Sequence, residues 1–258
     1  MKILVIGDVT SPGGLLHLEE NLWKKRNELG ADLVIVNGEN ASFVSAISPE
    51  AADKLFLCGA DVITGGNHTL QNKQSYSYLD EKQEMLRPIN FPVDAPGRGA
   101  CIVEAKNSYR VLVLNAMGTV HIEPQLDSPY SYLDRALREA EGKYDVSILD
   151  FHAEATGEKG AIAHYFDGRI SAIFGTHTHV PTADARILPN GTGFISDVGM
   201  CGESEGIIGM DPECVIEKLR TKLPSKFKPA DGRPIANAVL FTIDEKTSKT
   251  TRIERFDF

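Results

Sequence analysis

The chain is poor in cysteine, and it has no long hydrophobic run and no excess of basic residues. Its four cysteines contain no Cys-x-x-Cys pair, which excludes a small disulfide-framed secreted domain and favours reduced thiols. No segment approaches the roughly 20 apolar residues that a membrane-spanning helix needs, so we expect no membrane partner. The first apolar run, residues 1–6, is soon followed by an acid and is too short for a signal peptide, which predicts a cytoplasmic location.

The charge balance is acidic, with 27 Lys and Arg against 36 Asp and Glu and a formal net charge of −9. Such a surface argues against a protein that wraps DNA or long RNA. It does not exclude a small anionic substrate, because a bound metal ion reverses the local field. The 258 residues, 42 % of them hydrophobic, suffice for one large α/β domain or two small ones, and we expect a single domain over residues 1–258.

Short apolar runs alternate with helical segments along most of the chain. We expect helices at residues 15–29, 49–58, 71–86, 129–141 and 211–223, with a Pro-Gly-Gly turn at 12–14 before the first. We expect strands at residues 2–6, 33–36, 62–64, 101–105, 109–115, 145–151, 171–174, 193–197, 236–243 and 250–256. This alternation predicts an α/β layered fold with a mixed sheet, or two sheets packed face to face. The proline- and glycine-rich residues 87–99 predict a loop, and 71–107 is a candidate lid or cap.

The segment Gly65-Gly66-Asn67-His68-Thr69 follows the expected strand at 62–64. A glycine pair before an amide and an imidazole is typical of a tight turn that exposes polar groups at the end of a strand. Asn67 offers a carbonyl oxygen to a hard cation, and His68 gives or takes a proton near neutral pH. A plain strand-to-helix turn explains this segment alone equally well, so its meaning depends on the other strand ends.

Other expected strands end in the same kinds of residue. Ligands of open α/β sheets bind at the carboxyl ends of the strands, so these side chains are expected to converge on one rim. The residues at these ends are Asp8, Glu39, Asn40, Asn67, His68, His152, His177 and His179. Apart from His68 they are two carboxylates, two amides and three imidazoles without a thiolate, a set that suits Mn, Fe or Zn. Seven ligands are too many for one tetrahedral ion, which predicts two ions with a bridging carboxylate.

Each of these residues has a simpler explanation when it is considered alone. An aspartate after a strand commonly caps a helix, asparagines commonly form turns, and a single histidine such as His152 commonly lies hydrogen-bonded under a loop. The two imidazoles of Gly175-Thr176-His177-Thr178-His179 are harder to explain by packing. Because the simpler explanations need a separate coincidence at each strand end, we favour a metal site.

The same positions carry sequence motifs. The motifs are Gly7-Asp8, Gly38-Glu39-Asn40-Ala41, Gly66-Asn67-His68-Thr69, Asp150-Phe151-His152-Ala153-Glu154-Ala155-Thr156 and Gly175-Thr176-His177-Thr178-His179. With them the chain resembles the calcineurin-like metallophosphoesterases and, more narrowly, the YmdB-type bacterial phosphodiesterases. The resemblance runs from residue 1 to beyond residue 200 and so covers most of the chain.

The resemblance implies a four-layer αββα sandwich with a mixed sheet core and a small lid region. It also implies two divalent or trivalent metal ions per chain, with Fe foremost and Mn or Zn as alternatives. Asp8, Glu39 and His179 would hold one ion, Glu39 would bridge, and Asn40, Asn67, His152 and His177 would hold the other. The implied activity is hydrolysis of cyclic nucleotides such as 2′,3′-cyclic AMP by a metal-activated hydroxide, with His68 as the proton donor. The implied assembly is a homo-oligomer.

Some positions depart from the pattern of the family. General metallophosphoesterases carry a histidine two residues after the first aspartate, where this chain has Thr10, and the YmdB-type proteins share that loss. The glycines usual after Gly-Glu-Asn-Ala are replaced by residues 42–45, and the usual tryptophan after Gly-Asn-His-Thr is Leu70. The ligands are intact while the pocket walls differ, so substrate preference is the least direct inference from the resemblance.

Two other functions stay open at this point. One is a general phosphomonoesterase or nuclease that uses the same metals, although the acidic surface speaks against long nucleic acid. The other is a metal-binding regulatory or scaffold protein with weak turnover, since altered pocket walls are compatible with lost catalysis. The Asn67-His68 pair favours an enzyme. Asp150 is a candidate to orient His152, with a strand-end cap as the alternative.

Overall fold

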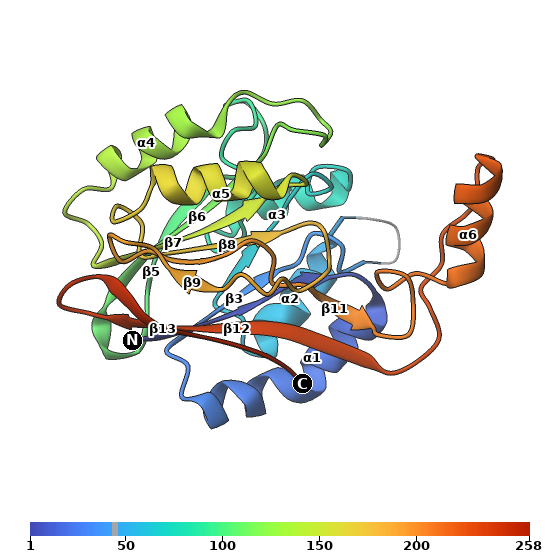
Figure 1. Ribbon diagram of the computed structural model, residues 1–258, viewed down its shortest axis with the longest axis horizontal. Coiled ribbons are helices and arrows are strands. Elements are labelled where there is room, and N and C mark those ends of the chain that lie inside the picture. Colours follow the sequence, from blue (N-terminus) through green and yellow to red (C-terminus); the bar gives the residue numbers. More distant parts are fainter. Residues whose placement is uncertain (43–45) are drawn as a thin grey trace.

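The computed structural model describes residues 1–42 and 46–258. It contains two β-sheets packed face to face, with helices on both outer sides (Figure 1). This is the four-layer αββα arrangement that the resemblance implies, so the expected fold class is confirmed. Residues 43–45, part of the unusual segment after Gly-Glu-Asn-Ala, lie outside the described residues.

The first sheet is mixed, with the strand order β2-β11-β12-β1-β3-β4 and with β13 paired to β12. Strand β1 runs parallel to β3 and antiparallel to β12. Its uninterrupted apolar run matches this central position, where both faces of the strand are covered. The strands are β1 (Lys2–Ile6), β2 (Asp8–Val9), β3 (Leu33–Asn37), β4 (Val62–Thr64), β11 (Met200–Glu203), β12 (Pro234–Asp244) and β13 (Lys249–Asp257).

The second sheet has the order β5-β6-β7-β8-β10-β9. Strands β6, β7, β8 and β10 are parallel, so their carboxyl ends lie at the same edge. Strand β5 pairs antiparallel with β6, which follows it after a short connection. The strands are β5 (Ala100–Glu104), β6 (Arg110–Met117), β7 (Val146–His152), β8 (Ala172–Thr176), β9 (Arg186–Ile187) and β10 (Gly193–Ile195).

Three layers of buried apolar side chains hold the sandwich together. The layer between the sheets includes Val5 and Ile35 of the first sheet and Val113 and Ile148 of the second. Burial of one such side chain contributes about 1.5–3 kcal/mol, so this layer fixes how the two sheets lie against each other. The outer layers lie under α1 (Pro12–Leu29) and α2 (Pro49–Leu57) on one side and under α4 (Pro129–Glu139) and α5 (Thr156–Tyr165) on the other.

Most of the expected elements are present, but two expectations about helices were wrong. Residues 12–14 are the first turn of α1 rather than a turn before it, because Ser11 accepts a hydrogen bond from the Gly14 amide at 3.0 Å and caps the helix. Of the helix expected at 71–86, only α3 (Tyr76–Glu81) is α-helical. The short strands β2, β9 and β11 were missed, because so few residues carry no readable alternation.

The candidate lid at 71–107 divides into two parts. Its residues Ala100–Glu104 form β5, so this part belongs to the second sheet. The preceding residues 87–98 form a compact loop around Arg87, whose guanidinium donates to the carbonyl groups of Pro88 and Pro96 at 2.9 and 3.1 Å. A lid role for residues 71–99 stays a prediction.

Between β11 and β12 the chain leaves the sandwich. We call residues 204–233 the arm; its helix α6 (Pro212–Thr221) projects from the body and contains no buried residue (Figure 1). Like the other described helices, α6 lacks the length and apolar content needed to cross a bilayer. The two legs of the arm are joined by backbone hydrogen bonds, from Asp211 to Lys228 and from Ala230 to Gly209, both 3.0 Å long. The arm is therefore an ordered projection built on paired backbone.

Candidate metal centre

The carboxyl ends of strands from both sheets meet at one rim. Asn37, at the end of β3, donates to Asp150 of β7 at 3.0 Å and to Thr176 of β8 at 3.3 Å. Thr64, at the end of β4, donates to the same Asp150 oxygen at 2.5 Å. All four residues are buried. These bonds between the sheets bring the loops that follow the strands together, as the argument from strand ends predicts.

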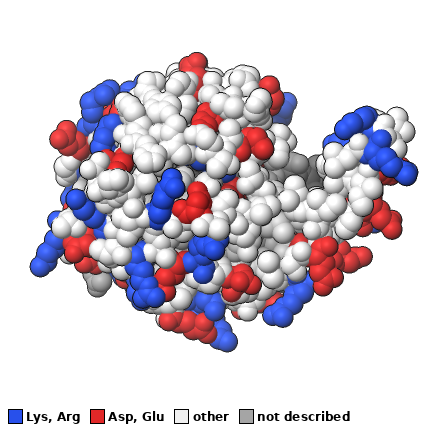
Figure 2. Space-filling model, in the orientation of Figure 1, with Lys and Arg blue, Asp and Glu red and all other residues white. Residues whose placement is uncertain are grey.

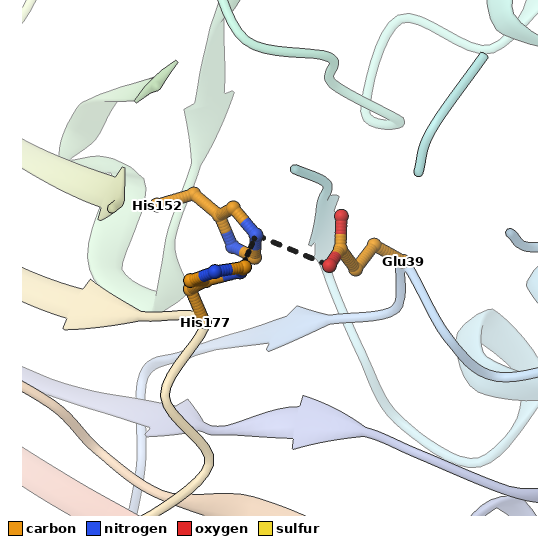
Figure 3. Close-up of side chains that lie close together, drawn as sticks. All are labelled: Glu39, His152 and His177. Carbon is orange, nitrogen blue, oxygen red and sulfur yellow. Dashed lines mark hydrogen bonds and ion pairs between the residues drawn. The ribbon is translucent and has the colours of Figure 1, made fainter. Parts of the chain in front are cut away.

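The centre of the rim is a cluster of Glu39, His152 and His177 (Figure 3). Glu39 follows β3, His152 is the last residue of β7, and His177 follows β8. Nε2 of His152 lies 3.1 Å from Glu39 Oε1 and 3.1 Å from His177 Nδ1. One ligand atom from each residue lies within 4.8 Å of the others. Imidazole nitrogens and a carboxylate oxygen at this spacing can bind one ion of the Mn, Fe or Zn type.

Hydrogen bonds orient both imidazoles of the cluster. The Thr176 hydroxyl donates to Asp150 Oδ1 at 2.7 Å, so it accepts from Nδ1 of His152, which lies 2.9 Å away. Nε2 of His152 is thereby left to face the cluster, where Asn67 Oδ1 also lies 3.0 Å away. The ring of His177 is positioned by Glu154, whose Oε2 lies 3.1 Å from Nε2 of His177. Several acceptors therefore surround one point, an arrangement that a cation stabilises.

Asp8 and His179 lie next to His152, whose Nδ1 is 3.8 Å from Asp8 Oδ1. Asp8, on β2, is fully buried, and its Oδ2 accepts from the His177 amide at 3.1 Å. Its Oδ1 has no hydrogen-bond partner among the described residues, and lies 3.7 Å from His179 Nε2. A buried carboxylate oxygen without a partner is costly unless a cation balances it. This orphaned oxygen supports a second ion between Asp8 and His179.

Asn40 and His68 form a pair at the solvent side of Glu39. Oδ1 of Asn40 lies 2.8 Å from Nδ1 of His68, and the amide nitrogen of Asn40 donates to Glu39 Oε1 at 3.2 Å. The backbone of His68 donates to Glu39 Oε2 at 3.1 Å, while its side chain is 31 % exposed. The Asn40 oxygen is thus engaged by His68, and its role as a metal ligand stays a prediction.

Burial and mutual charge shift the pKa values in the cluster. Burial raises the pKa of Asp8 well above its usual range. Burial alone would lower the pKa of His152, but the carboxylates of Glu39, Asp8 and Asp150 together raise that pKa to about 9. Burial likewise opposes ionisation of Glu39, yet His152 lowers its pKa to about 2. Burial, reinforced by His152, lowers the pKa of His177 to about 3. The cluster therefore favours one positive charge, on His152, and opposes a second one on His177.

The loop that carries His177 and His179 is strained and is held from below. Their φ angles are 98° and 66°, a region that costs a residue with a side chain about 1–3 kcal/mol. Thr178, between them, donates to Asp197 Oδ2 from its amide at 3.1 Å and from its hydroxyl at 2.8 Å. Lys159 of α5 forms a buried ion pair with the same oxygen at 2.7 Å. This buried pair fixes the loop that aims both imidazoles.

Gly66 leaves space beside the cluster. A Cβ atom at this position would lie 2.3 Å from both Glu39 Oε2 and His152 Nε2. The absence of a side chain therefore keeps a cradle open between two ligand atoms. With the orphaned oxygen of Asp8 and a donor set of nitrogen and oxygen, the residues present fit a pair of metal ions.

The structure places all of the sequence-predicted site residues at this rim, and their individual roles stay predictions. Sequence reasoning missed the groups that support them. The carboxylate of Asp150 reaches His152 only through Thr176, and the ion pair beneath the histidine loop joins Lys159 to Asp197. Thr176 lies in the motif that contains His177 and His179, but no local sequence pattern shows which side chain its hydroxyl will contact. The supporting residues missed are Asn37, Thr64, Glu154, Lys159, Thr176 and Asp197.

Comparison with known proteins gives a match over nearly the whole chain. Residues 4–256 match the family described as YmdB-like protein. The chain is 42 % identical over 255 residues to a 2′,3′-cyclic-nucleotide 2′-phosphodiesterase of Bacillus subtilis (strain 168), covering 99 % of this chain and 96 % of that protein.

Two solved structures share the fold closely. A hypothetical protein from Thermus thermophilus is 38 % identical with a TM-score of 0.93, and the similarity covers 100 % of this chain and 99 % of that one. A phosphatase from Mycoplasma pneumoniae is 34 % identical with a TM-score of 0.92, covering 100 % of this chain and 93 % of that one. Both extend over the rim and the arm together.

Proposed function

The chain belongs to the YmdB-like protein family, and from this premise we propose that it is a binuclear-metal phosphodiesterase that hydrolyses 2′,3′-cyclic nucleotides such as 2′,3′-cyclic AMP. The observation that carries the proposal is the rim itself. Two carboxylates and three imidazoles from both sheets present nitrogen and oxygen atoms to each other, and one buried carboxylate oxygen is left without a partner among the described residues. Such a group is suited to metal-assisted phosphoryl transfer.

We propose that the ligands divide between two ions as the family resemblance implies. Asp8, Glu39 and His179 would hold one ion, and Asn40, Asn67, His152 and His177 would hold the other, with Glu39 shared between them. Fe is the proposed metal, as the family resemblance implies, and Mn and Zn are alternatives because a donor set of nitrogen and oxygen without a thiolate suits all three. When bound, such ions lower the pKa of water and neutralise charge on a phosphate.

His68 is the proposed proton donor to the ribose oxygen that leaves phosphorus. Its Nδ1 lies 2.8 Å from Asn40 Oδ1, so Nδ1 keeps its hydrogen and Nε2 is the nitrogen free to exchange a proton. His68 also lines a cavity beside the rim, which gives a substrate access to it. Asn40, which donates to Glu39 from its other amide atom, links the position of the proton donor to that of the bridging carboxylate.

The proposal is tested by purifying the protein without chelator and measuring metal per chain together with hydrolysis of 2′,3′-cyclic AMP. We expect two metal ions per chain and turnover that the variant Asn67→Ala loses, because Asn67 supplies an oxygen at the cluster. Two ions without turnover of any cyclic nucleotide would favour another phosphoester or a regulatory role. A protein that binds no metal would refute the proposed function.

We further propose a homo-oligomer that acts on a small cytoplasmic substrate and not on long nucleic acid. The exposed apolar side chains of Ile216, Leu219 and Leu223 in the arm offer a surface for a second copy of the chain.

Four free cysteines suit a reducing compartment. Basic and acidic side chains are interspersed over the face drawn in Figure 2, unlike the continuous basic surface that long nucleic acid requires. Light scattering of the purified protein measures the number of chains.

A further inference from the structure

The cavity beside the metal centre has two chemically different sides. It has a volume of about 500 Å³, which is ample for a mononucleotide. The side formed by the rim carries the polar groups of Asn40, His68 and His179. The rest of the lining comes from the arm and is mainly apolar, with Ile208, Met210, Lys226, Phe227 and Pro229. A ligand that fills this cavity therefore meets both the polar groups of the rim and an apolar wall.

The apolar wall is fixed in place although α6 beyond it is exposed. Met210 and Ile207 exchange backbone hydrogen bonds at 3.0 and 2.8 Å, and Lys228 forms an ion pair with Asp211 at 3.3 Å. The root of the arm lies against the rim: a Cβ atom on Gly209 would lie 2.8 Å from Oγ1 of Thr10. The distance between the wall and the metal centre is therefore set by backbone packing.

Phe227 is the aromatic residue of this wall. Its side chain is 43 % exposed, and Nζ of Lys218 lies 4.2 Å from its ring centroid. A cation above the ring occupies one face, so the ring is available to the cavity through its other face or its edge. A partly exposed aromatic ring at the wall of a pocket for a small anion is a platform on which a nucleobase stacks.

We propose that Phe227, with Met210 beside it, holds the nucleobase of a 2′,3′-cyclic nucleotide while the cyclic phosphate lies at the metal centre. This inference rests on the proposed function. In such a nucleotide the base and the phosphate are attached to opposite sides of the ribose, so a phosphate at the rim directs the base toward the arm. The described residues lining the cavity include Lys226 and no carboxylate, which fits an anionic ligand.

The test compares two metal-loaded variants of Phe227 and one control variant on substrates with and without a base. For Phe227→Ala we expect the KM for 2′,3′-cyclic AMP to rise about 10- to 100-fold, the range for loss of one base–aromatic stack, with little change in kcat. The variant Phe227→Trp keeps a ring and is expected to retain a KM near that of the wild type. Hydrolysis of methyl 4-nitrophenyl phosphate, which has no base, is expected to be unchanged. Arg220→Ala, on α6 and outside the cavity, is the matched control for the arm.

Two further readouts separate stacking from a structural role. The preference for 2′,3′-cyclic AMP over 2′,3′-cyclic UMP is expected to fall in Phe227→Ala, because a purine stacks over a larger area than a pyrimidine. Binding of adenosine, measured by equilibrium dialysis, is expected to weaken by a similar factor without any turnover. An unchanged KM and an unchanged base preference in Phe227→Ala would overturn this inference and leave the proposed function standing. An equal loss on the base-free diester would also overturn it. A wild-type protein that neither binds nor hydrolyses 2′,3′-cyclic AMP would refute both.

Discussion

The rim and the arm are built in opposite ways. At the rim, Asp8 and His152 are fully buried, and side chains from both sheets form hydrogen bonds to one another. In the arm, α6 buries no residue, and Phe227 is 43 % exposed. Groups that share a metal ion must keep their spacing within fractions of an ångström, and burial at the rim provides this, whereas the wall of the arm is held by backbone hydrogen bonds at its root while α6 stays exposed. The difference teaches that the fold fixes the chemistry rigidly and leaves recognition to a projecting segment.

The largest effect on metal binding at the rim is expected from a side chain that fills the space beside the candidate ligands. Gly66→Ala would place a Cβ atom 2.3 Å from Glu39 Oε2 and His152 Nε2, so we expect loss of bound metal and a fall in turnover of about 1000-fold or more. Metal analysis and a turnover assay check this. Gly160→Ala is the control, since a Cβ there meets nothing within 4 Å in helix α5 and is expected to stabilise the chain by about 0.5–1 kcal/mol. Full metal content in Gly66→Ala would contradict the inference that Gly66 leaves the space needed for a metal ion.

His68→Ala separates proton donation from metal binding. We expect metal to be retained and turnover of 2′,3′-cyclic AMP to fall about 10²- to 10⁴-fold, because the poor leaving group loses its acid. Hydrolysis of a diester with a 4-nitrophenolate leaving group needs no acid and is expected to change little. If both substrates lose turnover equally, the His68 side chain acts on the metal centre through its contact with Asn40, which donates to Glu39, rather than on the leaving group.

Thr176→Val tests the bonds beneath the rim. It removes the hydroxyl that joins His152 to Asp150, so we expect metal affinity to fall about 10- to 100-fold, measured by competition with a chromogenic chelator. Thr176→Ser keeps the hydroxyl and is expected to restore affinity. Equal affinity in the valine variant would show that packing alone orients His152.

The smallest effect concerns one proton. In the metal-free protein the pKa of His152 is about 9, raised above its ordinary value of 6.5 by Glu39, Asp8 and Asp150 against the effect of burial. The stability that this contributes is present below about pH 6.5 and is lost as the pH rises through 9. At pH 7.5 we therefore expect metal binding to release about one proton from His152, and at pH 10 to release almost none. Calorimetric titration with metal in buffers of different ionisation heats measures the number of protons released.

Much of the fold and of the site could be predicted because the signals are local. The apolar run of β1, the Ser48 cap before α2 and the Gly30 stop after α1 lie within a few residues of the elements they define. The extent of α3 and the short strand β2 could not be predicted, because pairing with distant strands decides them. The site could be placed because chemistry-bearing residue types stand at the ends of the predicted strands.

By itself the sequence determined the types of the candidate ligands, their positions after the strands and hence the proposed class of metal chemistry. Only the tertiary structure decided how those residues are held. Asn37 reaches Asp150 across 113 positions, and Asp8 accepts from the His177 amide across 169. The apolar wall beside His68 comes from an arm about 140 positions later in the chain. Such contacts depend on how two sheets pack against each other, and packing is a property of the whole core that no local pattern of residues encodes.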